Sequence, residues 1–434
     1  MGGSSENEKV GISIPDVVEQ PCGLYPGVER FSADSGAEDY CGWVEQSNGD
    51  PLPAPLVLYL QNDPHLHKTS SAGTVVAHAI EQELRLQGAL FDDDRPLKQL
   101  ICAGSIATGW SDDQLYRIVS VIQSSFHINH DSLSNWCACT RDVVPSMGRL
   151  RLLRVLGFNH LRLMPETSDR EALPVEPLIA ALNEAKKLGF KTTILDLRRV
   201  SARPVALRQT LTALLAKAQP DRIRTAPPPE GDDGASVDTF MASCGYQDIG
   251  LGWHLRTGDS WWHAKNADRL YWTTLGYGEL QSPDVIGVGP GALSAVCDFY
   301  GINEASLPAY AASLDEGILP IVQGAVLEDA DVLRREIVAM ILASSCIRVS
   351  AIENKWGIRF EQFFSCESEL LRAFERNRWV RWQDDRIEIM TNGHRELMEI
   401  CTVFDGRNSN PLTHAAHPGG RSAGAAYNRS VNFT

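Results

Sequence analysis

The sequence contains no Cys-x-x-Cys pair, and its ten cysteines are scattered along 434 residues. Structural zinc and iron–sulfur sites take most of their ligands from closely spaced cysteines or histidines. Only Cys137 and Cys139 lie near each other, and two thiols do not complete such a site. No Ser–His–Asp set and no close carboxylate pair stands out either. Composition and spacing therefore predict no metal site, and we assign no catalytic residue.

Basic residues are outnumbered, since 40 lysines and arginines stand against 55 aspartates and glutamates, for a formal net charge of −15. A negative mean field repels nucleic acid and anionic lipid, so neither is an expected partner. The longest apolar run, residues 337–347, contains two serines and is shorter than the roughly 18 residues of a membrane span. The first residues lack the basic and apolar blocks of a signal peptide. We expect a cytoplasmic protein with no membrane partner, and the sequence indicates no protein partner.

What the sequence does contain is a repeated strand–helix rhythm. Apolar residues recur at helical spacing between short strand-like runs, and two helical segments end at Gly157 and Gly189. This alternation is typical of parallel βαβ units. About six in series favour a partial (β/α) barrel, although a doubly wound open sheet fits nearly as well. Strands are expected at 56–60, 100–103, 134–139, 160–164, 192–197, 222–225 and 246–251, and helices at 75–90, 113–126, 147–156, 175–188 and 205–218.

From about residue 305 the pattern becomes mostly helical, and both ends of the chain lack an apolar period. The late segments are helices at 307–314, 329–345 and 361–377, strands at 379–383 and 387–390, and a helix at 393–404. We therefore predict four parts: a partly disordered N-terminal extension (1–50), a partial barrel (51–304), an α-rich C-terminal domain (305–405) and a flexible tail (406–434).

Four segments are long enough to compare with known families: GYQDIGLGWHLRTGD (245–259), GYGELQSPDVIGVGPGALSAVCDFYGIN (276–303), AIENKWGIRFEQFF (351–364) and RIEIMTNGHRELMEICTVFD (386–405). Together they resemble oxygen-independent coproporphyrinogen III oxidase, the HemN-like radical S-adenosylmethionine (SAM) enzyme of haem synthesis. A weaker similarity extends back to about residue 20. The resemblance implies an α/β fold, a partial (β/α)6 TIM-like barrel of the radical SAM type with an α-rich C-terminal domain over the barrel mouth.

The resemblance breaks down in the loop after the first strand, where the family carries three cysteines that hold a 4Fe–4S cluster. In LVLYLQNDPHLHKTSSAGT the matching positions are His65, Thr69 and Ala72. Threonine and alanine offer no thiolate, and a cluster needs soft sulfur ligands. The 4Fe–4S cluster and S-adenosylmethionine are the family's cofactors, but we predict neither here. We expect His65 and His67 to be solvated or hydrogen-bonded, with divalent-metal binding as the alternative.

Three residues keep positions that the family uses near its cofactors. Tyr59 and Asp196 match positions that contact the nucleoside and cluster region, and Gly104 lies where the family has a glycine-rich segment. Side chains at Ala103 and Ser105 would restrict the close backbone approach that glycine allows. The resemblance thus implies Tyr59, Gly104 and Asp196 as the remaining cofactor-binding set. Structural roles at strand ends are the alternative for the tyrosine and the aspartate.

A group of tryptophans that includes Trp253 offers apolar faces suited to a flat macrocycle, and Arg256 could pair with a propionate. Gly287 and Gly289 lie in a glycine-rich segment that lacks the Lys-Ser/Thr of a phosphate loop. This segment resembles the family's turn near the porphyrin-facing loops. We predict a ligand pocket with Trp253, Arg256, Gly287 and Gly289 for a porphyrin or haem, and ordinary packing of the aromatics is the alternative.

These observations favour a degenerate, non-catalytic relative of coproporphyrinogen III oxidase with a tetrapyrrole-binding or regulatory role in haem metabolism. One alternative is an active anaerobic coproporphyrinogen III oxidase, which decarboxylates propionate side chains to vinyl groups by radical SAM chemistry. Another is a different enzyme that reuses the barrel mouth, with a metal at His65 and His67. The missing cluster ligands weigh against the active oxidase, because radical initiation needs an electron delivered through the cluster.

Overall fold

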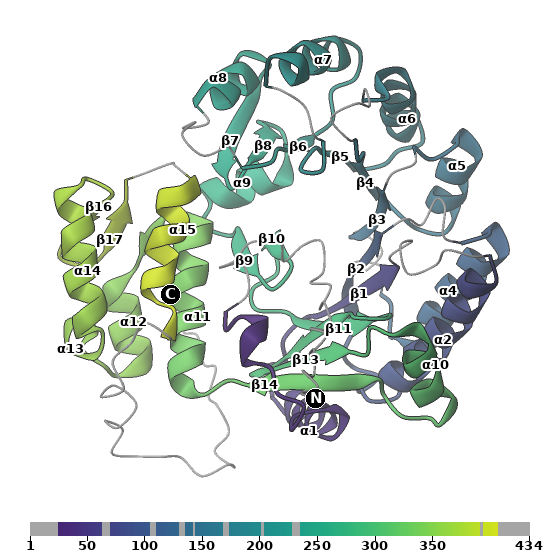
Figure 1. Cartoon of the computed structure of the whole chain (residues 1–434), viewed down its shortest axis with the longest axis horizontal. Coiled ribbons are helices and arrows are strands. Elements are labelled where there is room, and N and C mark those ends of the chain that lie inside the picture. Colours follow the sequence, from purple (N-terminus) through teal and green to yellow (C-terminus); the bar gives the residue numbers. More distant parts are fainter. Residues whose placement is uncertain are drawn as a thin grey trace, which may run out of the picture.

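A long curved sheet with helices along its outer side, and a smaller helical unit beside it, make up the chain (Figure 1). The computed structural model describes residues 25–62, 70–104, 110–129, 135–141, 144–167, 173–200, 204–227, 235–390 and 394–406. The first part of the predicted N-terminal extension and nearly all of the predicted tail lie outside these ranges.

The centre of the sheet consists of six parallel strands that follow one another in chain order. A helix connects each strand to the next, as the strand–helix rhythm predicted. The strands are β1 (Leu56–Asn62), β2 (Leu97–Gly104), β3 (Trp136–Arg141), β4 (His160–Met164), β5 (Thr192–Asp196) and β6 (Arg222–Arg224). The helices are α2 (Ser70–Gly88), α4 (Asp112–Ser125), α5 (Met147–Val155), α6 (Val175–Lys187) and α7 (Pro204–Lys217).

Hairpins extend this parallel core at both ends into one 12-stranded sheet. Beyond β6 lie β8 (Trp253–Arg256) and β7 (Tyr246–Gly250), which are antiparallel to their neighbours. On the other side β11 (Asp284–Val288) pairs parallel to β1, followed by β12 (Leu293–Val296), β13 (Phe299–Asn303) and β14 (Ile321–Val326). In the described part of the chain β7 and β14 do not pair, so the barrel is partial.

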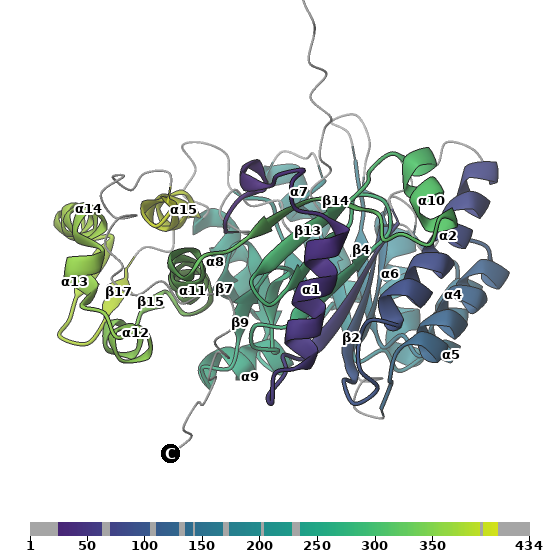
Figure 2. The same ribbon diagram turned by 90° about the horizontal axis from the view of Figure 1, so that it is seen from below.

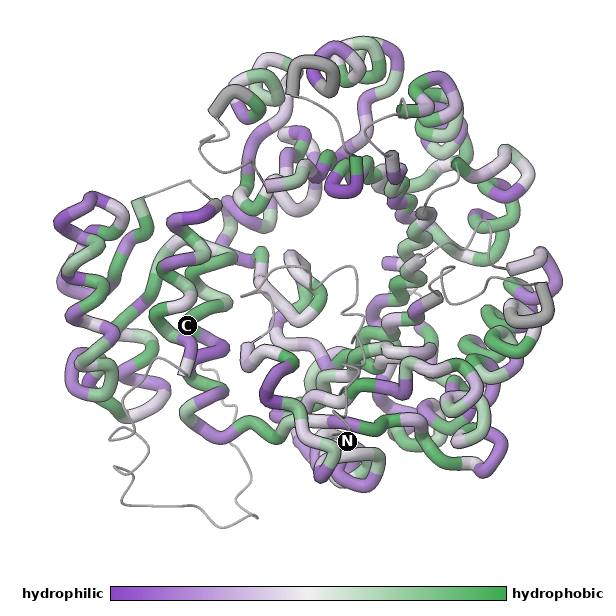
Figure 3. The backbone as a smooth tube through the Cα atoms, in the orientation of Figure 1, coloured by the Kyte–Doolittle hydropathy of each residue, from purple (hydrophilic) through white to green (hydrophobic). Residues whose placement is uncertain are grey.

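Local sequence explains where the outer helices begin and end. Before α4, the Ser111 hydroxyl accepts from the Gln114 N–H at 3.2 Å, and the Gln114 side chain accepts from the Ser111 N–H at 2.8 Å, which forms a capping box. After α6, Gly189 has a φ of +78°, which few other residues adopt. Both hydrophobic and hydrophilic stretches occur along the helices in Figure 3, as expected for helices with one buried side. Among the described helices, none is long and apolar enough to cross a lipid bilayer.

The sheet has two different faces. Its outer face packs with the outer helices in the largest apolar cluster, to which Leu161 and Leu163 of β4 and Leu195 of β5 belong. Successive side chains of a strand point to opposite sides. Arg162, between the two leucines, therefore points to the other side, which we call the inner face.

The C-terminal unit is helical and lies beside the barrel in both ribbon views (Figures 1 and 2). The large sheet continues through β14, and α10 (Leu307–Asp315) packs against α2, so the barrel ends after Val326, later than the predicted boundary at 304. The C-terminal unit contains α11 (Asp329–Ser344), β15 (Cys346–Ile347), α12 (Val349–Trp356), α13 (Phe360–Phe363), α14 (Ser365–Arg376), β16 (Val380–Trp382), β17 (Ile387–Ile389) and α15 (His394–Val403). The remaining elements are η1 (Val28–Arg30), α1 (Ala37–Asn48), α8 (Ala235–Ser243), α9 (Ser260–Asn266), β9 (Tyr271–Thr273) and β10 (Gly276–Gly278).

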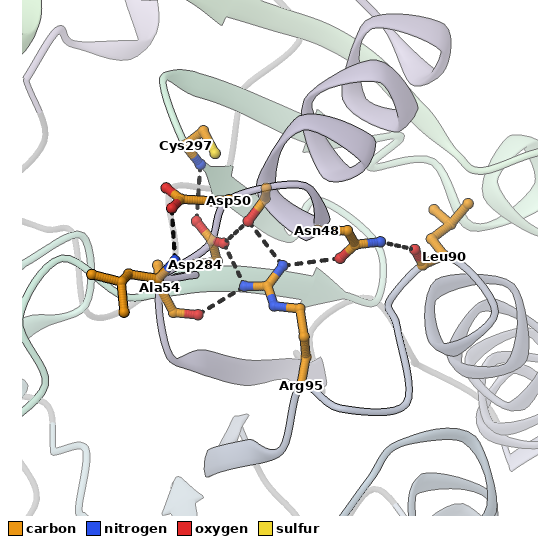
Figure 4. A network of polar contacts seen from close by, with 9 residues as sticks. Asn48, Asp50, Ala54, Leu90, Arg95, Asp284 and Cys297 are labelled. Atoms are coloured by element: carbon orange, nitrogen blue, oxygen red, sulfur yellow. Dashed lines mark hydrogen bonds and ion pairs between the residues drawn. The ribbon is translucent and has the colours of Figure 1, made fainter. Parts of the chain in front are cut away.

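A buried polar network ties α1 to the sheet at the start of β11 (Figure 4). Arg95 donates through Nη2 to Asp284 Oδ2 at 3.0 Å and to the carbonyl of Ala54 at 2.7 Å. Arg95 Nη1 donates to the Ser47 hydroxyl at 2.8 Å, and the Cys297 N–H donates to Asp284 Oδ1 at 2.9 Å. The network therefore joins α1, the segment before β2, β11 and the β12–β13 hairpin.

Candidate functional site

Three arginines surround one aspartate on the inner face, toward the carboxyl ends of β4, β5 and β6. Asp196, the last residue of β5, is buried at 1% exposure. Arg162 of β4 donates through Nε to Asp196 Oδ2 at 3.1 Å, and Arg198 donates through Nη2 to the same oxygen at 3.0 Å. Arg224 of β6 is in register with Asp196, and its charge acts on the carboxylate. We call Arg162, Asp196, Arg198 and Arg224 the arginine cluster.

The arginines of the cluster keep the buried carboxylate of Asp196 ionised. Burial alone would raise the pKa of Asp196, but Arg162 and Arg198 hold it well below its usual range, so the carboxylate stays ionised. Burial lowers the pKa of Arg162, and Asp196 outweighs this effect and raises it. Buried charges are costly unless they are paired. Asp196 is thus a buried, ionised carboxylate that Arg162 and Arg198 contact directly.

Tryptophan rings hold these arginines in place. The guanidinium carbons of Arg162 and Arg224 lie 5.6 and 5.1 Å from the ring centre of Trp253 in β8, within the range of cation–π attraction. Trp261 of α9 meets Trp253 edge-on, with 5.1 Å between ring centres. The guanidinium of Arg222 stacks 3.8 Å from the Trp261 ring. Trp253 is therefore a buried support for the arginines.

Two thiols lie on the inner face next to the arginine cluster. Ala138 belongs to the large apolar cluster on the outer face of the sheet. Cys137 and Cys139, one residue to either side, therefore both point to the inner face. Cys139 is in register with Arg162. A hydrogen bond from Cys139 and the charge of Arg162 lower the pKa of Cys137, against the effect of burial. The inner face thus combines guanidinium groups with an acidified thiol.

Of the predicted cofactor-binding residues, Gly104 and Asp196 lie at the carboxyl ends of parallel strands, where barrels of this type bind ligands, and Tyr59 is the middle residue of β1. Tyr59 lies on the inner face, in register with Ile101 and Gly287, and is 1% exposed. Gly104 ends β2 with a φ of +79°. Asp196 belongs to the arginine cluster, three strands away from β2. The structure therefore places Asp196 in the cluster but does not bring Tyr59 next to it.

Close backbone packing accounts for Gly287 and Gly289. A Cβ at Gly287 would lie 2.3 Å from the carbonyl oxygen of Leu293, and a Cβ at Gly289 would lie 2.3 Å from that of Gln61. Gly289 also has a φ of +113°. Both glycines are required where β1, β11 and β12 meet, and a role in a ligand pocket stays a prediction.

Arg256 does not share a face with Trp253. Along β8, Trp253 and Leu255 pack in the cluster with the C-terminal unit, so alternation puts Arg256 on the other side. Arg256 is exposed, and its N–H donates to the carbonyl of Asp221 at the amino end of the parallel strands. The structure therefore does not bring together the predicted pair of Trp253 and Arg256. Arg162 and Arg224 lie against Trp253 instead.

The ligands available do not match the family's 4Fe–4S cluster. The sequence has no cysteine between residues 42 and 101, which include the loop after β1. Of the described thiols near the arginine cluster, only those of Cys137 and Cys139 point inward, whereas Cys102 packs in the outer cluster. A cluster of this kind needs three or four thiolates at one point. Ala72 lies in α2, and three other positions lie outside the described residues: His65, His67 and Thr69.

The arginines at this site were not predicted from the sequence. Arg162 interrupts a strand that is otherwise largely apolar, and Arg222 and Arg224 flank Ile223 in β6. Strands of a parallel sheet are normally apolar on both faces. Charged residues at alternate positions of such strands are therefore a signal that could have revealed the inner face.

Curated proteins similar to this chain share one name, oxygen-independent coproporphyrinogen III oxidase. The Escherichia coli (strain K12) enzyme is 24% identical over 425 residues, which cover 88% of this chain and 91% of the enzyme. The Salmonella typhimurium enzyme is 25% identical over 359 residues, 75% of this chain and 78% of the enzyme. The Pseudomonas aeruginosa enzyme is 24% identical over 422 residues, 88% of this chain and 92% of the enzyme. No family model matches the chain.

A solved structure confirms the fold. Coproporphyrinogen III oxidase (HemN) from Escherichia coli, a radical SAM enzyme, superposes with a TM-score of 0.79 at 23% identity, over 88% of this chain and 96% of that chain. The resemblance inferred from the sequence motifs is thus confirmed over most of the chain, and so is the α/β fold of the radical SAM type.

Proposed function

We propose that this chain is a non-catalytic relative of oxygen-independent coproporphyrinogen III oxidase that binds a tetrapyrrole carboxylate through the arginine cluster. The grouping of Arg162, Arg198 and Arg224 around the buried carboxylate of Asp196 carries this proposal. Guanidinium groups bind carboxylates through paired, charge-assisted hydrogen bonds. A porphyrin with propionate side chains supplies such groups on an apolar ring. A cytoplasmic role as carrier or regulator in haem metabolism, with neither nucleic acid nor membrane as partner, belongs to the same proposal.

The lack of cysteine ligands in the loop after β1 supports the non-catalytic part of the proposal. The relatives are oxidases by name, and the similar structure is that of a radical SAM enzyme. Radical SAM chemistry uses a thiolate-bound cluster, and residues 42–101 of this chain contain no cysteine. We therefore assign the inner face to binding and derive no redox step there.

Titration with coproporphyrin III and with haemin, followed by tryptophan quenching and the Soret shift, tests the binding. Arg198→Gln removes one of three cations, and because Arg162 still pairs with Asp196, the variant should fold. Loss of a charged hydrogen bond worth about 1.5–3 kcal/mol predicts affinity roughly 10- to 150-fold weaker. Arg256→Gln, which removes an exposed guanidinium from the other face, is the matched control and should bind normally. The absence of a saturable change at micromolar ligand, or unchanged affinity in Arg198→Gln, would overturn the proposal.

Anaerobic reconstitution with iron and sulfide separates this proposal from an active oxidase. We expect the reconstituted protein to hold far fewer than about four irons per chain. Stoichiometric iron that is lost on mutating the loop after β1 would instead support radical SAM chemistry.

A further inference from the structure

One histidine and two aspartates converge away from the arginine cluster, at the β7 end of the sheet. His254 of β8, Asp248 of β7 and Asp238 of α8 offer ligand atoms that all lie within 4.8 Å of one another. Asp248 and His254 are direct partners in the β7–β8 pairing, so their side chains share a face. Asp238 Oδ1 lies 3.9 Å from His254 Nε2. Three separate elements therefore bring nitrogen and oxygen donors to one point.

His254 is buried at 1% exposure, with its ring on the outer face, opposite the side to which Trp253 and Leu255 point. Its Nε2 lies 3.4 Å from the Thr225 hydroxyl, and its Nδ1 has no hydrogen-bond partner among the described residues. Burial lowers the pKa of His254. A buried imidazole with one unpartnered nitrogen beside two carboxylates is a donor set that suits a metal ion.

We propose that His254, Asp238 and Asp248 bind a divalent transition-metal ion of the Zn²⁺ class. Imidazole and carboxylate ligands bind Zn²⁺ at about 2.0–2.2 Å, and the imidazole disfavours Mg²⁺ and Ca²⁺, which prefer oxygen. Ligands at such distances lie roughly 3–3.5 Å apart around a tetrahedral ion. The observed 3.9 Å between Asp238 and His254 needs only a small shift of the carboxylate, whose side chain is 47% exposed. Three protein ligands leave a coordination position for water.

The bound ion would fasten α8 to the β7–β8 hairpin, which forms one end of the sheet. The nearby ammonium group of Lys265 donates to the carbonyl of Ile249 at 2.8 Å. The site lies on the opposite face from the arginine cluster, so it does not depend on the proposed tetrapyrrole binding.

Zinc titration by calorimetry and metal analysis after dialysis test this inference, with Asp238→Asn and Asp248→Asn as variants. Both side chains are partly or largely exposed, so the variants should fold, which circular dichroism checks. We expect one zinc per chain in the unaltered protein and affinity weakened at least about 10-fold in each variant. Zinc should raise the melting temperature of the unaltered protein, and this rise should be smaller in Asp238→Asn and Asp248→Asn. Asp268→Asn, an exposed carboxylate on the turn after α9, is the charge-matched control and should bind normally.

A second variant, in which His65, His67, His130, His414 and His417 are replaced by alanine, separates this site from those histidines outside the described residues. It should keep one zinc per chain and the same zinc-dependent rise in melting temperature. Zinc binding that survives unchanged in Asp238→Asn and Asp248→Asn, or that disappears in the five-histidine variant, would overturn the assignment.

Discussion

Glu83 of α2 is a fully buried carboxyl group that connects three parts of the barrel. The N–H of Gly289 donates to its Oε2 at 2.8 Å, the Asn303 side chain donates to its Oε1 at 2.7 Å, and the Tyr310 hydroxyl also donates to it. Burial raises the pKa of Glu83 to about 7, although these hydrogen bonds act in the opposite direction. The folded protein therefore holds a proton that the unfolded chain releases near pH 4.5.

We predict that this carboxyl group makes the protein less stable as pH rises from about 5 to 7. In this range the unfolded state binds fewer protons than the folded state. The stabilisation that is fully present below pH 4.5 is therefore lost as the pH rises through the folded-state pKa of about 7. The loss is up to about 3 kcal/mol. Urea unfolding at several pH values should show the decline in the unaltered protein and a flatter profile in Glu83→Gln. Glu45→Gln, on the exposed side of α1, should keep the decline, and an equal decline in Glu83→Gln would contradict the prediction.

Arg95 and Asp284 form the buried ion pair of the network in Figure 4, at side-chain exposures of 1% and 3%. Removing one member leaves the other charge buried and unbalanced, which typically costs about 3–5 kcal/mol. We predict a loss of this size for Arg95→Met in denaturant unfolding. Arg85→Met, which removes an exposed guanidinium from α2, should change stability by less than about 1 kcal/mol. A loss below that level in Arg95→Met would show that the remaining hydrogen bonds suffice for Asp284.

Only some residues of the arginine cluster were predictable from the sequence. Asp196 was selected because it matched a family position, and the structure places it in the arginine cluster. Arg198 and Arg224 were not selected, because their importance depends on neighbours that only the register of β5 and β6 supplies. Arg256 was selected from its nearness in sequence to Trp253, but strand alternation separates the two.

At the scale of elements, the parallel strands and their helices were predictable because each carries its own periodic pattern and stop signals. The predicted bounds of the strand at 160–164 agree with β4, and helix α6 ends one residue before the predicted end. Strands β11 to β14 were not predicted, and glycines break the alternation of β11, β13 and β14. Gly287, Gly301 and Gly324 each lie where a Cβ would approach other atoms within 3.0 Å. Close packing between strands therefore requires glycine at these positions, and the local sequence pattern of these strands is typical of loops.

We predict that Gly289→Ala destabilises the junction of β1 and β11 by at least about 1 kcal/mol. Its φ of +113° disfavours any side chain, and the new Cβ would meet the backbone oxygen of Gln61, which cannot rotate away. Gly42→Ala, in α1 with no atom within 4 Å of the added Cβ, is the matched control and should be neutral or stabilising. Thermal unfolding of the two variants checks this, and an unchanged melting temperature in Gly289→Ala would contradict it.

At the scale of the whole molecule, the N-terminal segment links the barrel to the C-terminal unit. The hydroxyl of Tyr300 in β13 donates to the carbonyl of Tyr25 at 3.1 Å, and the Tyr25 hydroxyl lies 3.4 Å from Asp331 in α11. Burial and the charge of Asp331 raise the pKa of Tyr25 to about 12, so this hydroxyl stays protonated. Arg30 makes two hydrogen bonds to Asp331, at 2.6 and 3.1 Å. Asp331 is therefore the residue of the C-terminal unit to which Tyr25 and Arg30 of the N-terminal segment bind.

The overall architecture was accessible from the sequence, because motifs spread over most of the chain agree with one family and one fold. The proposed zinc site was not, since Asp238 lies outside the segment 245–259 that contains Asp248 and His254, and the three residues come together only when α8 packs over the β7–β8 hairpin.

We predict that Asp331→Asn weakens the coupling between the two units. The asparagine keeps the shape but loses the negative charge that Arg30 binds, at an expected cost of about 1–3 kcal/mol. Arg30 is 40% exposed and can turn to solvent, so replacing Arg30 itself should cost less. Scanning calorimetry should show the heat absorption of Asp331→Asn broadening or dividing into two transitions, because the units then unfold less cooperatively. Asp329→Asn removes an exposed carboxylate from the same helical turn and should leave a profile like that of the unaltered protein. An Asp331→Asn profile that matches this control would mean that apolar packing between α11 and the barrel suffices to couple the units.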